Sequence, residues 1–151
     1  MPGMRRALLI ACSQRKTADC RPIPAIRRYD GPAFRVLRRY LLHNHDDELR
    51  VWVLSAEFGL IPMDKPILAY DRRMTSGRAA ELAPSVAREL ECAVNLAGPT
   101  ELFICVGKTY LTALSDWRPS RIAVRLGAPG QGRKLSSLKN WLWEEADRVR
   151  R

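Results

Sequence analysis

Four short segments of this 151-residue chain contain between them nucleophilic, cationic and glycine residues, and each segment follows an apolar run. Hydroxyl groups, cations and free backbone N–H groups in one place suit a phosphate or another anion. These segments are therefore the expected binding site. They are Cys12-Ser-Gln-Arg-Lys16, Ser55-Ala-Glu-Phe-Gly-Leu-Ile61, Gly107-Lys-Thr-Tyr110 and Gly127-Ala-Pro-Gly-Gln-Gly-Arg-Lys134.

The first segment offers the hydroxyl of Ser13 and the ammonium group of Lys16 for holding an anion. Because nearby cations favour the thiolate form of a cysteine, catalysis by Cys12 is a second interpretation. None of the four segments has the glycine spacing of a phosphate-binding loop or of a dinucleotide fingerprint. No Cys/His spacing matches a zinc site. The sequence therefore predicts neither a cofactor nor a metal.

Two carboxylates stand out as candidate catalytic groups. Glu57 follows the second apolar run, and Asp71 follows Tyr70 in a loop bounded by proline. A tyrosine beside a carboxylate can hold a base or a sugar and activate water; the alternative is a turn that leads into a helix cap. Phe58 either packs in the core or stacks on a base.

The glycine-rich segment 127–134 opens the last expected helix, and a helix N-terminus attracts anions. Gly130 and Gly132 allow a ligand to approach the backbone closely. Arg133 and Lys134 place cations where the helix dipole disfavours them, a mismatch that a bound anion would neutralise. The alternative is a solvated turn.

Apolar runs alternate with amphipathic segments, which predicts how these residues are positioned. Strands separated by helices indicate right-handed βαβ units, and hence a three-layer α/β sandwich with a mostly parallel sheet of at least four strands, in a single domain over residues 1–151. In such a sheet ligands bind beyond the carboxyl ends of the strands. The expected strands are Ala7–Ala11, Val51–Leu54, Leu102–Val106 and Ile122–Leu126, after the first of which residues 12–31 form an irregular loop. The expected helices start at Pro32, at Thr75 or Ser76 (ending near Ala97), at Lys108 and near Leu135.

The charge balance points to a polyanionic partner. Lys and Arg total 26 against 16 Asp and Glu, for a net charge of +10. Such an excess favours nucleic acid or a nucleotide, although a GC-rich genome also raises the arginine content. Arg35, Arg38 and Arg39 share one side of the second expected element and are expected to form an exposed surface for nucleic acid.

The cysteines and the apolar runs indicate the cellular compartment in which the protein is expected to work. Four cysteines without a disulfide framework are typical of a reducing cytoplasm. No apolar run approaches the ~20 residues that cross a bilayer. The sequence therefore predicts a cytoplasmic protein with no membrane partner, and it leaves the oligomeric state open.

Five motifs in this order resemble a known family: Cys-Ser-x-x-Lys at 12–16, Tyr-Asp-Gly-x-x-Phe at 29–34, Leu-Ser-Ala-x-Phe-Gly-Leu-Ile at 54–61, Tyr-Asp at 70–71 and Gly-x-x-Gly-x-Gly at 127–132. Together they resemble the small bacterial YaaA-like, or peroxide-stress-like, proteins. Proteins of that family are associated with DNA binding and protection from oxidative damage. The opening motif is also similar to a segment of the catalytic domain of archaeosine synthase, which is related in fold to uracil-DNA glycosylases. The resemblance implies work on nucleobases in nucleic acid.

Two main functions follow as hypotheses. The first is an enzyme acting on a nucleobase or its N-glycosidic bond, in which Asp71 or Glu57 positions water or stabilises an oxocarbenium-like sugar. The second is a non-catalytic DNA-binding stress-response protein; a nucleotide sensor is a third. The expected substrate-binding residues are Cys12, Ser13, Lys16, Tyr29, Phe34, Ser55, Phe58, Gly59, Tyr70, Gly107, Lys108, Gly130, Gly132 and Arg133.

Overall fold

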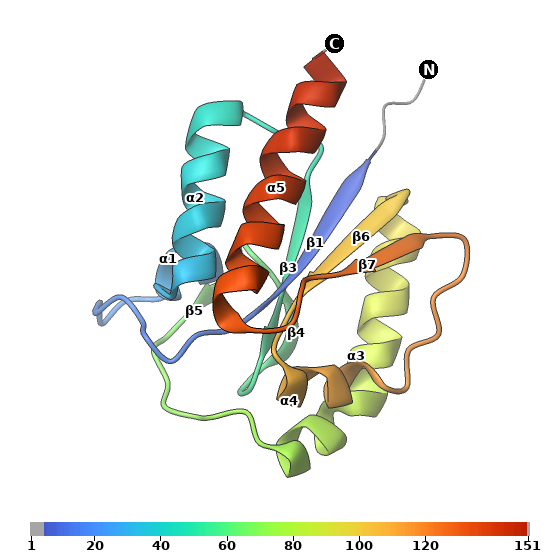
Figure 1. The fold of residues 1–151 in the computed structure, drawn as a ribbon. Coiled ribbons are helices and arrows are strands. Elements are labelled where there is room, and N and C mark those ends of the chain that lie inside the picture. The colour runs from blue at the N-terminus through green and yellow to red at the C-terminus, as the bar shows by residue number, and fades with distance from the viewer. Residues whose placement is uncertain (1–4, 151) are drawn as a thin grey trace.

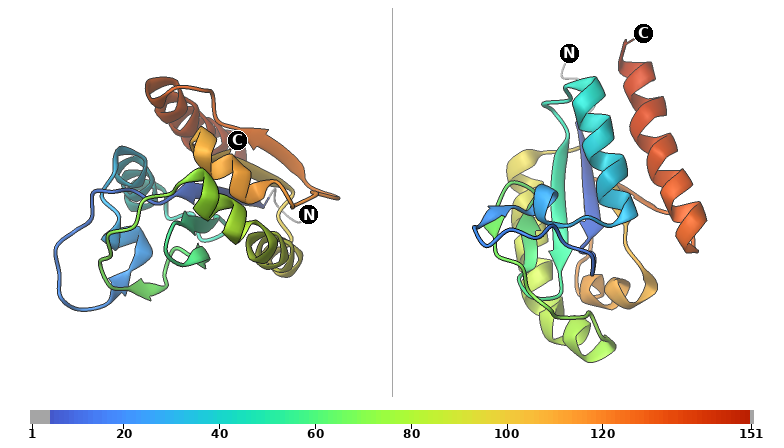
Figure 2. Two further views of the ribbon diagram at one scale, coloured as in Figure 1. Left: turned by 90° about the horizontal axis from the view of Figure 1, so that it is seen from below. Right: turned by 90° about the vertical axis from the view of Figure 1, so that its left-hand side faces the viewer.

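A five-stranded sheet lies between two layers of helices (Figures 1 and 2) in the computed structural model, which describes residues 5–150 and the side chains of residues 5–143. The strand order is β4-β3-β1-β6-β7. Four strands are parallel, namely β1 (Arg6–Ala11), β3 (Arg50–Ser55), β6 (Glu101–Cys105) and β7 (Ala123–Leu126), whereas β4 (Gly59–Pro62) runs antiparallel to β3. The predicted three-layer α/β sandwich is confirmed.

The helices divide between the two faces of the sheet. α2 (Pro32–Asn44) and α5 (Gln131–Arg150) cover one face, while α3 (Ser76–Ala97) and the 3₁₀ turn η1 (Thr112–Leu114) cover the other, with α4 (Lys108–Leu111) joining β6 to η1. The hydroxyl of Thr75 accepts the N–H of Arg78 and caps α3, as its sequence predicts. Among residues 5–150, no helix has the length and apolar character needed to cross a membrane.

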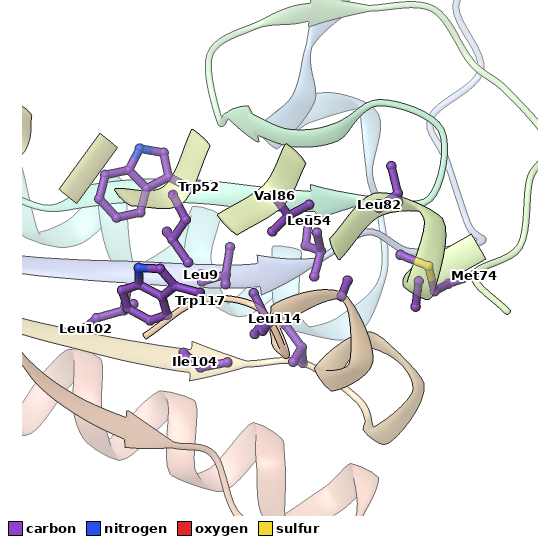
Figure 3. Packing of buried hydrophobic residues seen from close by; sticks show 14 of the residues in the cluster. Leu9, Trp52, Leu54, Met74, Leu82, Val86, Leu102, Ile104, Leu114 and Trp117 are labelled. Atoms are coloured by element: carbon purple, nitrogen blue, oxygen red, sulfur yellow. The ribbon is translucent and has the colours of Figure 1, made fainter. Parts of the chain in front are cut away.

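Side chains of the central strands β1, β3 and β6 alternate between two buried clusters, which is why these strands read as continuous apolar runs, whereas β7 at the edge of the sheet is mostly exposed. In β1, Leu8 and Ile10 face α2 and α5, whereas Leu9 faces α3. Figure 3 shows the cluster on the α3 side, where Leu9 and Trp52 pack with Val86. Both faces of the sheet are therefore fixed by apolar packing, and its carboxyl edge is free to carry polar residues.

The segment after β1 is more ordered than the irregular loop that the sequence predicts. It contains β2 (Ile23–Pro24), which pairs antiparallel with β5 (Pro66–Ile67), and the short helix α1 (Ala25–Arg28). The side chain of Arg28 is fully buried. Its guanidinium group donates to four backbone carbonyl oxygens, those of Thr17, Asp19, Arg21 and Ile67, at 2.6–3.2 Å. A single cation therefore fastens this segment to β5.

The order of the strands reverses between β1 and β6. The chain adds β3 on one side of β1 and then crosses to β6 on the other side. The register pairs Ala11 with Leu54 and Ile10 with Cys105, which places the residue after β1 level with the ends of both neighbours. Open α/β sheets bind ligands at such a switch point.

Candidate functional site

A cavity of about 350 Å³ opens at the carboxyl ends of β1 and β6, at this switch point. Its walls come from the segment after β1, the first turns of α2 and α5, and α4 (Figure 1). Its polar lining consists mainly of Cys12, Ser13, Arg15, Tyr110, Gln131 and Lys134. The cavity therefore combines a thiol, hydroxyl groups and cations.

Cys12 is held between the loops that follow three strands. Its backbone N–H donates to the carbonyl oxygen of Leu54 at 3.0 Å, which continues the pairing with β3 beyond the end of β1. Its Sγ lies 3.1 Å from the hydroxyl of Tyr110 and accepts the N–H of Ala56 at 3.4 Å. Burial raises the pKa of Tyr110, and the neighbouring Cys12 raises it further, so the phenol stays protonated; its hydroxyl also donates to the carbonyl oxygen of Cys12 at 3.4 Å.

Three buried hydroxyl groups form a cluster beside Cys12. The hydroxyls of Tyr29 and Tyr70 lie 2.7 Å apart and lie 3.2 and 2.9 Å from Oγ of Ser55. Burial raises the pKa of Tyr29 to about 12 and also raises the pKa of Tyr70. Oγ of Ser55 accepts the N–H groups of Glu57 and Phe58 as well, so this serine also shapes the turn from β3 into β4.

Lys16 covers the hydroxyl cluster. Its Nζ lies 4.4 Å from the centre of the Tyr70 ring and donates to the carbonyl oxygen of Gln14 at 3.3 Å. Burial lowers the pKa of Lys16, while Cys12 and Asp71 act in the opposite direction. A partly desolvated amine therefore lies beside the cavity and within the electrostatic reach of both a thiol and a carboxylate.

Neither predicted catalytic carboxylate lines the cavity. Asp71 is exposed, and among the side chains of residues 5–143 no hydrogen bond or ion pair holds its carboxylate, although its charge acts on Lys16. Glu57 is half-buried and lies 3.9 Å from Arg72. The charge of Asp71 acts on Lys16 and that of Glu57 acts on Tyr29, so both carboxylates lie near the hydroxyl cluster but outside the cavity.

The sequence profile of a family of unknown function, DUF6884, matches residues 7–141. The chain belongs to this family. Residues 7–141 include all the residues named above that line the cavity or form the hydroxyl cluster. This match shows membership of DUF6884. Membership of the YaaA-like proteins stays a prediction.

One solved structure resembles the DUF6884 chain in fold. It is described as the crystal structure of AF0587, a protein of unknown function, and superposes with a TM-score of 0.57 at 15% identity. The similarity covers 94% of this chain but 46% of that one, so the DUF6884 chain spans less than half of the other protein's length. At this identity the likeness shows the fold alone. No curated protein matches the chain.

Ser13 fixes the cavity wall of this DUF6884 chain by contact with a glycine. Its Oγ donates to the carbonyl oxygen of Arg15 at 2.7 Å and accepts the N–H of Gly31 at 3.2 Å. A Cβ on Gly31 would lie 2.7 Å from the Cβ of Ser13, closer than real Cβ atoms approach. The sequence prediction omitted Gly31, although its position before the Pro32 helix start was a usable signal.

The cations of the glycine-rich segment do not all reach the cavity. α5 begins at Gln131 and not near Leu135. Lys134 therefore lies within the helix and lines the cavity. A Cβ on Gly107 would lie 3.7 Å from Nζ of Lys134, so this glycine leaves room beside the ammonium group. The sequence prediction had named neighbouring residues that are exposed and do not line the cavity: Lys108, Gly130, Gly132 and Arg133.

The aromatic residues split between core and surface. Phe34 is buried, borders the cavity and packs against Tyr29 with ring centroids 5.1 Å apart. Phe58 is 40% exposed and meets the Tyr70 ring edge-on at 5.4 Å, so it does not belong to the core. Gly59 has a φ of +74° at the start of β4, a conformation that glycine adopts without strain.

The predicted surface of three exposed arginines is only partly present. Arg38 is half-buried and donates to the carbonyl oxygens of Ile26 and Tyr29 and, at 2.6 Å, to Asp30. The sequence spacing correctly places Arg38 on α2. Its guanidinium group is occupied by Asp30 and two carbonyl oxygens, so it stabilises the fold and does not contribute to an exposed surface. Arg35, which pairs with Asp30 at 3.0 Å, and Arg39 are exposed.

Metal ligands do not gather in the part of the chain that the structure describes. There, no three His, Cys, Asp or Glu side chains lie close enough together to hold a metal ion. The chemistry available at the site is therefore that of a thiol, phenols, an amine and nearby carboxylates.

Proposed function

We propose that this DUF6884 domain is a nucleotide-binding enzyme that acts on a nucleobase or on its N-glycosidic bond. The observation that carries the proposal is the position and lining of the cavity: it lies at the switch point of the sheet, with Arg15 and Lys134 beside a thiol and a phenol. Its volume, about 350 Å³, is within the range of small-molecule sites.

The phosphate of such a ligand would lie near Lys134 and Arg15. The first turns of α2 and α5 also border the cavity, and their free N–H groups add positive potential on the same side. The base would pack between Phe34 and Tyr110, an apolar ring and a phenol that border the same space. One end of the cavity therefore suits an anion and the other a planar ring.

The proposed chemistry uses Lys16 and Asp71, which do not line the cavity themselves. Because the charges of Cys12 and Asp71 both act on Lys16, the bond that breaks would lie on the Cys12 side of the cavity, toward these two residues. A lowered pKa makes the ammonium group of Lys16 a stronger proton donor, and it would protonate the leaving base. Asp71, whose charge already acts on Lys16, would orient water and stabilise the positive charge that develops on the sugar. Water supplies the hydroxyl group at the sugar carbon, and the base leaves with the proton.

A second candidate is a non-catalytic nucleic-acid-binding protein. One observation favours it: neither Asp71 nor Glu57 lines the cavity, whereas cations do. The finer assignment to YaaA-like proteins belongs with this proposal, and it rests on the five ordered motifs between Cys12 and Gly132.

The binding step is tested by calorimetric titration of nucleoside monophosphates into the Lys134→Ala variant. Loss of one charged hydrogen bond lowers the affinity by roughly tenfold or more. The matched control is Arg88→Ala, which removes an exposed cation from α3 on the other face of the sheet. Equal affinities for the two variants would exclude the cavity as the binding site.

The catalytic step is tested by incubating the wild-type protein with nucleosides, nucleotides and oligonucleotides and separating the products by chromatography. Release or alteration of a base supports the enzyme. Tight binding that depends on Lys134 without any change in the base would instead support the non-catalytic binding protein.

A further inference from the structure

A second hollow, of about 580 Å³, lies between α2 and α5 on the outer surface. Its charged and titratable lining consists of Arg35, Arg39 and His43 from α2 and Lys139 from α5. The indole of Trp143 borders the same hollow and packs edge-on against the ring of Tyr40 at 5.2 Å. We call this hollow the α2–α5 groove.

The groove begins where the cavity ends. Residues 32–34 of α2 and Gln131, Lys134 and Leu135 of α5, in the first turns of the two helices, border the cavity, and later residues of the same helices line the groove. Figures 1 and 2 show the two helices side by side in each view, both starting at the carboxyl edge of the sheet. Nine residues of α2 separate Phe34 from His43, a length of about 14 Å.

The groove has an excess of positive charge. Among the side chains described, α2 and α5 carry no Asp or Glu. Arg39 and Lys139 form no ion pair within residues 5–143. The carboxylate beside Arg35 is Asp30, which also contacts Arg15 and Arg38, so one negative charge is shared by three cations.

We infer that the α2–α5 groove binds the backbone of a single-stranded nucleic acid whose target nucleotide enters the cavity. This inference rests on the proposed function and adds that the substrate is a polymer. A row of cations suits successive phosphates, and an aromatic ring beside it suits an unpaired base. The strand must be unpaired at the target because a base inside a duplex cannot reach a cavity of this kind.

The test measures the anisotropy of a labelled single-stranded oligonucleotide over a range of salt concentrations. Arg39→Ala and Lys139→Ala should each lower the affinity roughly two- to fivefold. Each should also reduce the slope of log K against log salt by about 0.7, the contribution of one phosphate contact on a single strand. Arg88→Ala, with the same loss of charge on the other face, should change neither quantity.

A third variant separates stacking from charge. Trp143→Leu should lower the affinity by at least about fivefold while leaving the salt slope unchanged, because stacking releases no counterions. Circular dichroism checks that this variant folds. If Arg39→Ala and Lys139→Ala behave like Arg88→Ala, the inference is wrong. Equal competition by duplex DNA or by polyglutamate would overturn the assignment to a single strand.

The groove and the cavity can fail separately. If nucleoside monophosphates bind in a manner that depends on Lys134 but an oligonucleotide binds no more tightly, the groove inference fails and the proposed function stands. If oligonucleotide binding depends on Arg39 and Lys139 but not on Lys134, the groove stands and the proposed cavity function fails.

Discussion

Replacing Ser55 with alanine should destabilise the protein and disturb the hydroxyl cluster together. The side chain is fully buried, and its Oγ accepts two backbone N–H groups, from Glu57 and Phe58, at 3.2 and 3.1 Å. Alanine leaves both donors without this acceptor. The two tyrosine hydroxyls lose a partner as well, but Tyr29 and Tyr70 keep the 2.7 Å contact between them.

The magnitude follows from the two N–H groups. A buried donor without an acceptor costs about 1–3 kcal/mol. Both groups lie where burial is partial, so water replaces some of the lost interaction and the lower part of that range applies. We therefore expect a loss of about 2–3 kcal/mol in the free energy of unfolding for Ser55→Ala, or about 1–1.5 M in the urea midpoint for a typical m-value of 2 kcal/mol/M.

Urea denaturation followed by circular dichroism measures this loss, and Ser85→Ala is the matched control. Oγ of Ser85 only donates to the carbonyl oxygen of Leu82 within α3, so its removal should be close to neutral. Because the hydrogen bond between Tyr29 and Ser55 lowers the pKa of Tyr29, the variant should also raise that pKa further. A loss of less than about 0.5 kcal/mol for Ser55→Ala would refute the assignment of its two N–H acceptor bonds, because it would fall below even a single unmade bond.

Three further predictions concern other parts of the site. Gly31→Ala should lower the free energy of unfolding, measured by urea denaturation, by about 1–3 kcal/mol, because the new Cβ would overlap a neighbouring side chain. Gly132→Ala, in open space within α5, should raise it by up to about 1 kcal/mol. Equal effects of the two substitutions would contradict the close contact at Gly31. If a base-directed activity is found, Asp71→Asn should lower turnover by about 10²-fold or more while leaving ligand binding intact, and a fully active variant would exclude this carboxylate. Burial raises the pKa of Tyr29 and Tyr40 to about 12 from 10.0, so the stabilisation from their protonated forms is complete below pH 10 and is lost as the pH rises to about 12. Spectrophotometric titration checks this: tyrosinate absorbance should appear near pH 10 only in the denatured protein.

The apolar pattern was enough to predict the parallel strands and the long helices, because both faces of β1, β3 and β6 are buried and each long helix has one apolar stripe. It missed β4, whose four residues end in Pro62. A proline lacks the N–H of a central strand and is tolerated at an edge, which is where β4 lies. The formation of a short antiparallel edge strand of this kind depends on the neighbouring strand more than on the strand's own composition.

The convergence of the loops was also predictable, but not which side chains face the cavity. The glycine-rich pattern assigns Lys134 to a turn, because it predicts that the last helix starts near Leu135. With the start at Gln131, Lys134 and Leu138 are four residues apart on one stripe, and the inward position of the lysine follows. The role of Arg38 could not be inferred from spacing, since its partner Asp30 precedes the helix and turns back onto it.

The way in which the segment after β1 is fastened gives it tolerance to acid. Arg28 binds four carbonyl oxygens, contacts that involve no carboxylate. Hydrogen bonds from Arg21 and Arg35 hold the pKa of Asp19 and of Asp30, respectively, at about 2, below the usual 3.8. Carboxylates with a depressed pKa stabilise the fold above pH 3.8 and lose that effect only as the pH falls towards 2. The pairs of Asp19 with Arg21 and of Asp30 with Arg35 should therefore persist at a pH at which an ordinary aspartate is already protonated.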